Sequence, residues 1–381
     1  MVDLRAYRVH IIVGCQSSPP SVALPECTRL VHELSKETRI ELLKGVLQRA
    51  SGRPPEVPGD VEPLIVCNFV DGTEADGYPG ISVTRELERR RLPFTGGDSR
   101  FCRVASSKTA QKAVFRKNGV ATSEYQEIEP LQLSTDMDTA ITSVGFPMIV
   151  KPIVSYGSLG ISKASVVHDK QEACSQVRAL FHSSHVNRVN QDGGVYVERF
   201  LNGPEYVAFL TGDATVGLKC YPVVQRLFHG AASREEQLLA FDAYWEDLRH
   251  GEDHRDDAGK EIFISYALVE DAALQGRLQE LAKKAYAVLG GNGYAKIDIR
   301  ADDDQNSNLY VLEVNVNAIL SLESRMAVGQ ILEVAAIDPR VLVEDIISYA
   351  VQRQYNLDHP ADEADDDPGS PGSPVTVQAG E

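Results

Sequence analysis

Four side chains suited to metal and phosphate chemistry lie on two adjacent apolar segments, residues 294–300 and 309–315. The polar stretch between these segments predicts a β-hairpin. Because side chains alternate between the two faces of a strand, the polar residues gather on one face of the hairpin. They are Lys296, Asp298, Glu313 and Asn315. Two carboxylates and an amide oxygen suit Mg²⁺, so the hairpin is a candidate metal site for a phosphate compound.

The alternative interpretation is an antiparallel strand pair that exposes one polar face to water. Against it, both segments are otherwise apolar, and an open face would more often carry Thr, Lys or Gln than an Asp together with a Glu. Residues suited to phosphate binding also occur upstream: Lys108 at a predicted helix start, Lys151 after an apolar strand, and a Ser/Gly-rich loop at 155–160. Taken alone, each lysine is equally typical of a solvated surface position, so the interpretation depends on the whole set.

The N-terminal third alternates strand and helix patterns. Residues 9–13 and 64–70 are predicted strands, and an apolar-periodic helix lies between them at 30–47. This βαβ order predicts a parallel sheet. We place a boundary near residue 104.

The remaining chain predicts two α+β units that lead to the hairpin. Asn118 and Gly119 end the first helix as a C-terminal cap, and the last helix is strongly amphipathic. The predicted strands are 146–152, 161–167 and 195–201, and the predicted helices are 107–117, one that ends near Phe181, and 271–290.

These pieces occur in an order that resembles one known family. Lys108, Lys151, the loop, Glu-Arg-Phe-Leu-x-Gly-x-Glu at 198–205, Lys-Ile-Asp and Leu-Glu-Val-Asn resemble the ATP-grasp fold of D-alanine–D-alanine ligases over about residues 64–350. The match is densest at 197–207, and Leu-Pro-Phe-Thr-Gly from Leu92 supports it. The resemblance implies an α/β fold, with an N-terminal Rossmann-like βαβ domain plus central and C-terminal α+β domains that sandwich ATP.

The expected domains follow from this resemblance and from composition. Residues 1–104 form the Rossmann-like domain, 105–196 the central subdomain with the phosphate-covering loop, and 197–357 the C-terminal subdomain with the metal site. The tail at 358–381 has seven acidic residues, no Lys or Arg, and Pro-Gly-Ser repeats, which predicts disorder.

The resemblance implies nucleotide contacts for the matched residues. Lys108 and Lys151 contact the phosphates, and the loop of small residues closes over them with backbone N–H groups. A hinge meets adenine through backbone groups and a Glu carboxylate, and Glu205 holds the ribose hydroxyls. The loop residues are Ser155, Gly157, Ser158 and Gly160, and the hinge residues are Glu198, Arg199, Phe200 and Leu201.

The resemblance also implies the metal and catalytic residues. Asp298, Glu313 and Asn315 match the family's magnesium ligands. Lys296 stands where such ligases place an Arg that stabilises the tetrahedral oxyanion, so the charge is kept and the bidentate fork is lost. Lys296 and Ser158 are therefore the expected catalytic residues. ATP and Mg²⁺, with Mn²⁺ as a substitute, are the expected cofactors.

The departures from the family surround the substrate rather than the nucleotide. Residues 13–18 lack the Gly-Gly-x-Ser loop, Asn68 replaces a common His, and 315–319 lack the usual Pro and Gly. Ser324 lies where the family binds the acceptor's carboxylate, and Arg325 would add a bidentate contact there. The two residues are equally suited to starting a helix.

We therefore expect an ATP-dependent ligase that joins a small carboxylate, such as an amino acid, to an amine through an acyl phosphate. ADP and phosphate are released, and dipeptide or specialised-metabolite synthesis is the expected context. The alternatives are a D-alanine–D-alanine ligase with a diverged donor pocket and an ATP-binding regulatory protein that has lost ligation. A dinucleotide oxidoreductase is disfavoured, because no Gly-x-Gly-x-x-Gly follows the first strand.

Charge and composition limit the partners. A formal charge of −17 disfavours nucleic acid and anionic membranes, which require a basic face. No apolar run approaches the roughly 20 residues that span a bilayer, and charges near the start interrupt any signal peptide, so we expect a cytoplasmic protein. The six cysteines have no CxxC spacing and are expected to be reduced and mostly buried. A homodimer is the assembly that the resemblance implies.

Overall fold

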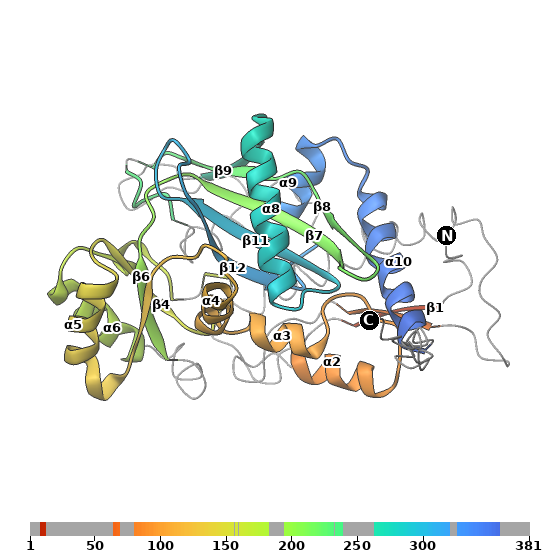
Figure 1. Ribbon diagram of the computed structural model, residues 1–381, viewed down its shortest axis with the longest axis horizontal. Coiled ribbons are helices and arrows are strands. Elements are labelled where there is room, and N and C mark those ends of the chain that lie inside the picture. The colour runs from red at the N-terminus through yellow and green to blue at the C-terminus, as the bar shows by residue number, and fades with distance from the viewer. Residues whose placement is uncertain are drawn as a thin grey trace, which may run out of the picture.

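The computed structural model describes residues 8–12, 64–68, 80–155, 157–158, 160–182, 194–231, 233–238, 263–320 and 326–358. Three sheets organise this part of the chain, and helices pack against them (Figure 1). No described helix is long and apolar enough to cross a membrane. The predicted helix at 30–47, Ser324, Arg325 and residues 359–381 of the acidic tail lie outside the described residues, whereas Asp358, expected to belong to the tail, is the last residue of a helix.

The N-terminal sheet has the predicted parallel arrangement. Strands β1 (Arg8–Ile12) and β2 (Leu64–Asn68) pair in parallel, and Val66 also forms a parallel bridge with Phe94. Helices α2 (Gly80–Arg89) and α3 (Ser99–Ala105) follow. The Asp98 side chain caps α3 by accepting a hydrogen bond from the N–H of Phe101, which fixes where this helix begins.

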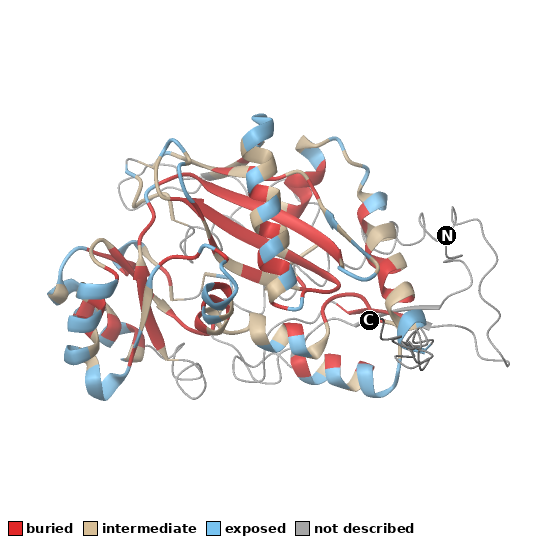
Figure 2. Cartoon of the chain, viewed as in Figure 1, coloured by how far each residue is buried: buried red, intermediate tan, exposed pale blue. Residues whose placement is uncertain are grey.

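The second sheet is antiparallel, in the order β3-β6-β4-β5. Buried residues of its strands pack against helices α5 and α6, whose outer surfaces are exposed (Figure 2). Its strands are β3 (Tyr125–Ile128), β4 (Met148–Pro152), β5 (Val166–Val167) and β6 (Val195–Arg199). The helices of this region are α4 (Lys108–Lys117), η3 (Pro130–Gln132), α5 (Leu133–Ser143), η4 (Lys163–Ser165) and α6 (Lys170–His182).

One predicted strand of this region is wrong in extent. The segment 161–167 is a strand only at Val166–Val167, and the helical turn η4 precedes it. The physical reason is a capping box. The Ser162 N–H donates to the Ser165 hydroxyl at 3.0 Å, and the Ser162 side chain in turn caps the Ser165 backbone, so local hydrogen bonds replace ladder pairing.

The largest sheet is also antiparallel, in the order β10-β9-β7-β11-β12, with β8 paired to β7. One long helix, α8, and the pair α9 and α10 pack against it. The strands are β7 (Glu205–Asp213), β8 (Gly217–Cys220), β9 (Val224–His229), β10 (Phe263–Leu268), β11 (Tyr294–Ala301) and β12 (Leu309–Val316). The helices are α8 (Ala272–Val288), α9 (Ala327–Val334) and α10 (Pro339–Asp358).

Alternation along β7 assigns the two faces of this sheet. Tyr206 and Ala208 belong to the core that includes α8, whereas Val207 and Phe209 belong to the core that includes α9 and α10. Asp298 of β11 pairs in register with Val207, and it therefore shares the face opposite α8. The predicted hairpin is confirmed, and its polar residues lie on the face opposite α8.

The four described cysteines are free. Cys67 and Cys174 are buried, whereas Cys102 and Cys220 are only partly buried. Burial raises the pKa of the Cys102 thiol to about 12, so this thiol is protonated and unreactive at neutral pH.

Candidate active site

The β11–β12 hairpin brings its four polar residues together. Lys296 pairs with Asn315 and Asp298 with Glu313 in the strand register. The Lys296 Nζ lies 2.9 Å from Asp298 Oδ2, and the Asn315 amide donates to Asp298 at 2.9 Å and to Glu313 at 3.3 Å. All four side chains therefore form one hydrogen-bonded group on one face of the sheet.

The donor set of this group fits a magnesium ion. The hairpin offers two carboxylates, Asp298 and Glu313, and the amide of Asn315. No group of three or more His, Cys, Asp or Glu side chains that could hold a metal occurs among the described residues. Mg²⁺ typically takes one or two carboxylates and completes its shell with water and phosphate oxygens. Burial opposes ionisation of Asp298, but Lys296 and Arg226 outweigh it and lower the pKa of this carboxyl, which keeps it an anionic ligand.

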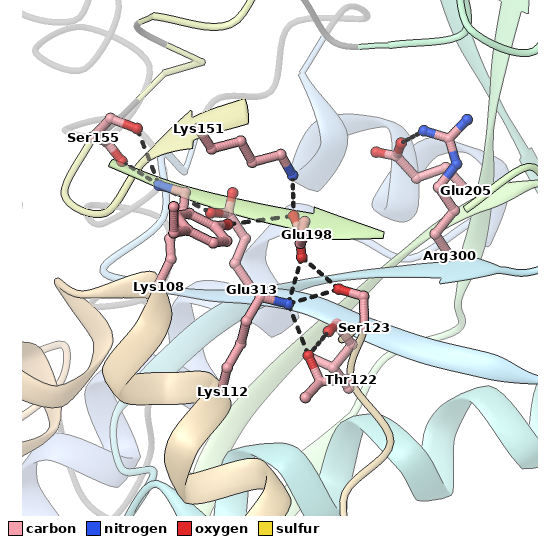
Figure 3. A network of polar contacts seen from close by, with 12 residues as sticks. Lys108, Lys112, Thr122, Ser123, Lys151, Ser155, Glu198, Glu205, Arg300 and Glu313 are labelled. Carbon is pink, nitrogen blue, oxygen red and sulfur yellow. Dashed lines mark hydrogen bonds and ion pairs between the residues drawn. The ribbon is translucent and has the colours of Figure 1, made fainter. Parts of the chain in front are cut away.

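Lys108 joins the hairpin to the Ser/Gly loop. Ser107 caps α4 and so places Lys108 at the first position of the helix. The Lys108 Nζ lies 3.3 Å from Glu313 Oε2, 2.8 Å from the carbonyl oxygen of Ser155 and 3.1 Å from the Ser155 hydroxyl (Figure 3). One ammonium group thus contacts both the candidate metal ligands and the loop that is expected to cover phosphates.

The loop itself turns through the left-handed region of backbone space. Gly157, Ser158 and Gly160 have φ of 57°, 62° and 80°. At Gly160 a Cβ would lie 2.8 Å from the Pro152 side chain, so glycine is required both for conformation and for space. No hydrogen bond joins the two expected catalytic residues, Ser158 and Lys296, in the described part of the chain.

A buried carboxylate, Glu198, is enclosed by two lysines. Lys112 Nζ and Lys151 Nζ each lie 2.7 Å from it, and the Ser123 hydroxyl donates to it (Figure 3). Glu198 is 1% exposed. Burial alone would raise the pKa of its carboxyl, but the two ammonium groups reverse that effect and hold the pKa well below the ordinary range.

We call Glu198, Lys112, Lys151, Thr122 and Ser123 the Glu198 cluster. Lys112 also donates to the hydroxyls of Thr122, at 2.9 Å, and Ser123, at 3.0 Å. The Tyr196 hydroxyl donates to Glu198 at 3.3 Å. The carboxylate expected to meet adenine is therefore engaged by protein side chains, and it fixes the position of Lys151.

The backbone of the predicted hinge is partly engaged as well. The N–H of Arg199 donates to the Glu124 carbonyl at 2.9 Å, and that of Phe200 to the Pro147 carbonyl at 3.0 Å. Leu201 is buried, and no described residue accepts a hydrogen bond from its N–H. The Arg199 Nε and Nη2 are likewise buried without a hydrogen-bond partner among the described residues. Buried donors without a protein acceptor are suited to a bound acceptor such as a purine edge.

A second buried carboxylate, Glu205, is enclosed by two arginines. Glu205 of β7 pairs in register with Arg226 of β9 on one side and with Arg300 of β11 on the other. Arg226 Nη1 donates to Glu205, and Arg300 Nη1 lies 3.5 Å from it. Arg226 Nη2 also reaches Asp298 at 3.3 Å. We call Glu205, Arg226, Arg300 and Asp298 the Glu205 cluster.

Sequence reasoning missed five members of these clusters, the hydroxyl residues Thr122 and Ser123 and the cations Lys112, Arg226 and Arg300. Lys112 lies one helical turn after Lys108, so helical spacing was a usable signal. Arg300 lies two residues after Asp298, and strand alternation places it on the same face. No pattern around Arg226 indicated its position, because its alignment opposite Glu205 depends on the pairing of strands that are far apart in sequence.

The sequence of this chain also matches a known protein family and several named proteins. The family model described as D-ala D-ala ligase C-terminus matches residues 114–348, more than half of the chain. A D-alanine–D-alanine ligase of Nitrosococcus oceani is 24% identical over 364 residues, which cover 94% of this chain and 98% of that protein. A D-alanine–D-alanine ligase of Acinetobacter baumannii is 24% identical over 230 residues. The match to it covers 60% of this chain and 62% of the length of that relative.

Solved structures show the same fold. A D-alanine–D-alanine ligase from Bacillus anthracis matches with a TM-score of 0.64 at 18% identity, covering 92% of this chain and 100% of that one. The VanG D-Ala:D-Ser ligase from Enterococcus faecalis matches with a TM-score of 0.57 at 17% identity, covering 78% and 74%. The fold is therefore that of the ATP-grasp ligases, and the chain belongs to the family defined by the C-terminal domain of D-alanine–D-alanine ligases.

Proposed function

We propose that the protein is an ATP-dependent ligase that joins a small carboxylate to an amine through an acyl phosphate. One observation carries the proposal. Lys108 of α4 and Lys296 of β11 contact Glu313 and Asp298 on the polar face of the hairpin, and Lys151 of β4 contacts the buried Glu198. Cations around a carboxylate pair suit a nucleotide triphosphate with its metal ion, as phosphoryl transfer requires. The named relatives, which are ligases, support the same reaction class.

In this proposal each cluster serves a different part of the nucleotide. The buried donors of Arg199 and Leu201 would meet the base, and Glu205 would accept hydrogen bonds from the ribose hydroxyls. Lys108 and Lys151 would contact the phosphates, with Lys151 held in place by Glu198. Asp298, Glu313 and Asn315 would hold Mg²⁺, which neutralises phosphate charge when bound.

The proposed chemistry has two steps. A carboxylate oxygen of the first substrate attacks the γ-phosphorus of ATP, and ADP leaves. The amine nitrogen of the second substrate then attacks the carbonyl carbon, loses a proton, and expels phosphate. Lys296 would stabilise the oxyanion of the tetrahedral intermediate, and the loop that carries Ser158 would exclude water that hydrolyses an acyl phosphate.

Two asparagines in or next to the segments that depart from the family bear on the substrate. Asn68 is buried, and its N–H donates to the Thr95 hydroxyl at 3.0 Å. The Asn317 side chain accepts a hydrogen bond from the Gly97 N–H at 2.9 Å. Both asparagines therefore hold the turn at 94–97. The segment between the N-terminal sheet and the hairpin is thus fixed by hydrogen bonds particular to this chain. This favours a carboxylate–amine ligase with its own substrates.

The second candidate is a D-alanine–D-alanine ligase proper. The Nitrosococcus oceani relative favours it, since that protein bears this name and the alignment covers nearly all of both chains. The VanG neighbour is named as a D-Ala:D-Ser ligase, so D-serine belongs among the test acceptors.

The test is release of ADP and phosphate from Mg-ATP in the presence of pooled D- and L-amino acids and dipeptides, with mass spectrometry of the products. A substrate-dependent product with a new C–N bond supports the ligase, and D-Ala-D-Ala as the main product selects the second candidate. A protein that binds ATP and yields no product with any pool would contradict ligation of these substrates.

Glu313→Gln is the matched variant for this assay. The side chain is partly exposed and its substitution keeps shape while removing one candidate metal ligand. We expect turnover to fall by about 10³-fold with unchanged circular dichroism, since loss of a placed charge stabiliser has effects of this size. Retained turnover would refute the metal assignment.

A further inference from the structure

Arg226 connects two buried carboxylates that come from different strands. Its Nη1 donates to Glu205 of β7, and its Nη2 donates to Asp298 of β11 at 3.3 Å. Its Nε donates to the Tyr266 hydroxyl of β10 at 3.4 Å, and the guanidinium lies 5.7 Å from that ring. The Arg226 side chain is 2% exposed. The guanidinium is therefore a fixed, desolvated cation whose geometry is set by residues of three strands.

The core around Arg226 is otherwise apolar on this face of β9. The neighbour of Arg226 on the same face is Val224, which is fully buried in the core shared with α9 and α10. A buried ion pair costs desolvation, and replacing all of its members by apolar side chains of similar volume is often as stable or more so, although removing one member alone destabilises the fold. The charge therefore calls for a functional explanation.

The other cations of the site each serve one acid. Arg300 contacts Glu205 and the carbonyl oxygens of Gly203 and Arg234. Lys296 contacts Asp298. Among the described residues, Arg226 is the side chain that bonds to both acids. Under the proposed function these acids hold the ribose and the metal ion, so Arg226 stands between the two halves of the nucleotide site.

We propose that Arg226 is a positioning residue that makes the site prefer a nucleotide over a free divalent cation. Its charge opposes a bare metal ion beside Asp298 and favours the negatively charged nucleotide. Its two bonds also hold Glu205 and Asp298 at a fixed separation before either ligand arrives. The metal ion then enters together with the nucleotide phosphates, which offset the positive charge of Arg226. This inference rests on the proposed function.

The proposal has a signature that a purely structural role lacks. Loss of packing would weaken both ligands or neither. Loss of the charge must act in opposite directions: the metal ion alone binds more tightly and the nucleotide alone binds less tightly. A unit charge at hydrogen-bonding distance in a buried site is large enough for a change of about 10-fold or more in each constant.

The experiment measures both affinities separately on the full chain. Mn²⁺ alone is titrated and followed by the electron paramagnetic resonance of the free ion. A non-hydrolysable ATP analogue is titrated calorimetrically with a chelator present. For Arg226→Met we expect Mn²⁺ to bind about 10-fold more tightly and the analogue about 10-fold more weakly. Arg226→Gln, which keeps a donor but no charge, gives the same pattern and serves if the Met variant fails to fold.

Arg300→Met is the matched control, because Arg300 is a buried arginine that contacts Glu205 and not Asp298. We expect weaker binding of the analogue and Mn²⁺ affinity within about 3-fold of wild type, because the distance from the metal ligands reduces the effect of charge. Unchanged Mn²⁺ affinity in both Arg226 variants, or weakening of both ligands, would overturn the role of Arg226 while leaving the ligase proposal intact. A wild-type protein that binds no nucleotide with or without Mn²⁺ would overturn the proposed function and this inference together.

Discussion

The Glu198 and Glu205 clusters both stabilise a buried carboxylate, but they use different cations to do so. In each, a buried glutamate lies between two buried or nearly buried cations. The Glu198 cluster uses lysines from α4 and β4, and serine and threonine hydroxyls complete the shell. The Glu205 cluster uses arginines that are its register neighbours in one sheet, and it continues into Asp298.

Lysine and arginine are suited to different roles in the two clusters. A lysine ammonium is a compact charge that can point at one acid and still serve a phosphate, which suits Lys151 beside Glu198. An arginine fork can hold two acids at once, as Arg226 does with Glu205 and Asp298. The Glu198 cluster therefore holds one lysine, Lys151, in position. The Glu205 cluster links Glu205 to Asp298 through Arg226.

The largest effect is expected from Glu205→Gln. It leaves Arg300 buried without a carboxylate partner among the described residues, and it leaves Arg226 with Asp298, which Lys296 also uses. Removing one partner from a buried ionic group commonly costs 3–5 kcal/mol, and we expect a loss of about 4 kcal/mol in the free energy of unfolding, measured with urea. Glu86→Gln is the control, since Glu86 of α2 also lies between two arginines but all three side chains are exposed. Equal effects of the two substitutions would show that burial does not distinguish them.

Lys112→Met should break the Glu198 cluster less severely. Glu198 keeps Lys151, so one cation remains for one buried carboxylate. We expect the free energy of unfolding to fall by about 3 kcal/mol, at the lower end for a broken buried pair. Adding Glu198→Met to the same chain should cost less than the sum of the single losses, because the pair is coupled. Strict additivity would contradict the coupling.

The pH dependence of the free energy of unfolding tests the electrostatics of the Glu198 cluster directly. The pKa of Glu198 in the folded chain is lowered by Lys112 and Lys151 against the opposing effect of burial. Ionised Glu198 therefore stabilises the fold above the unfolded-state pKa of about 4.3, and this contribution is lost as the pH falls below that value. The slope from this one group reaches about 1.4 kcal/mol per pH unit.

Urea unfolding between pH 5 and pH 3 measures this slope. Wild type should lose stability more steeply than Glu198→Gln, which has no proton to gain at that position. Parallel curves for the two proteins would mean that Glu198 titrates normally. The groups that face its carboxylate are Lys112, Lys151, Ser123 and Tyr196.

The local parts of this architecture could be predicted from the sequence. Alternation along residues 294–300 and 309–315 identified the hairpin and its polar face, because a strand period of two is a local property. The helix at 108–117 could also be predicted, since its cap Ser107 and the terminating Gly119 are local signals. The shortened strand at Val166 was not, because a capping box competed with an apolar pattern.

The clusters could not be assembled from the sequence, because they depend on pairing at long range. The side chains of Lys112 and Glu198 meet across elements that are 86 positions apart in the chain. Glu205, Arg226 and Arg300 meet because β9, β7 and β11 are neighbours in one sheet, an order that does not follow the chain. The family resemblance supplied a role for Glu205 but no reason to expect arginines on both sides of it.

The smallest effect is expected from Arg116→Met, on the same helix as Lys112. Arg116 Nη2 lies 2.5 Å from Glu124, and the guanidinium lies 4.3 Å from the Tyr125 ring. The side chains of Arg116 and Glu124 are 40% and 60% exposed, so water already solvates both charges. We expect a loss below about 1 kcal/mol by urea unfolding, reduced further at high salt. A loss as large as that of Lys112→Met would mean that position on α4, rather than burial of the pair, sets the cost.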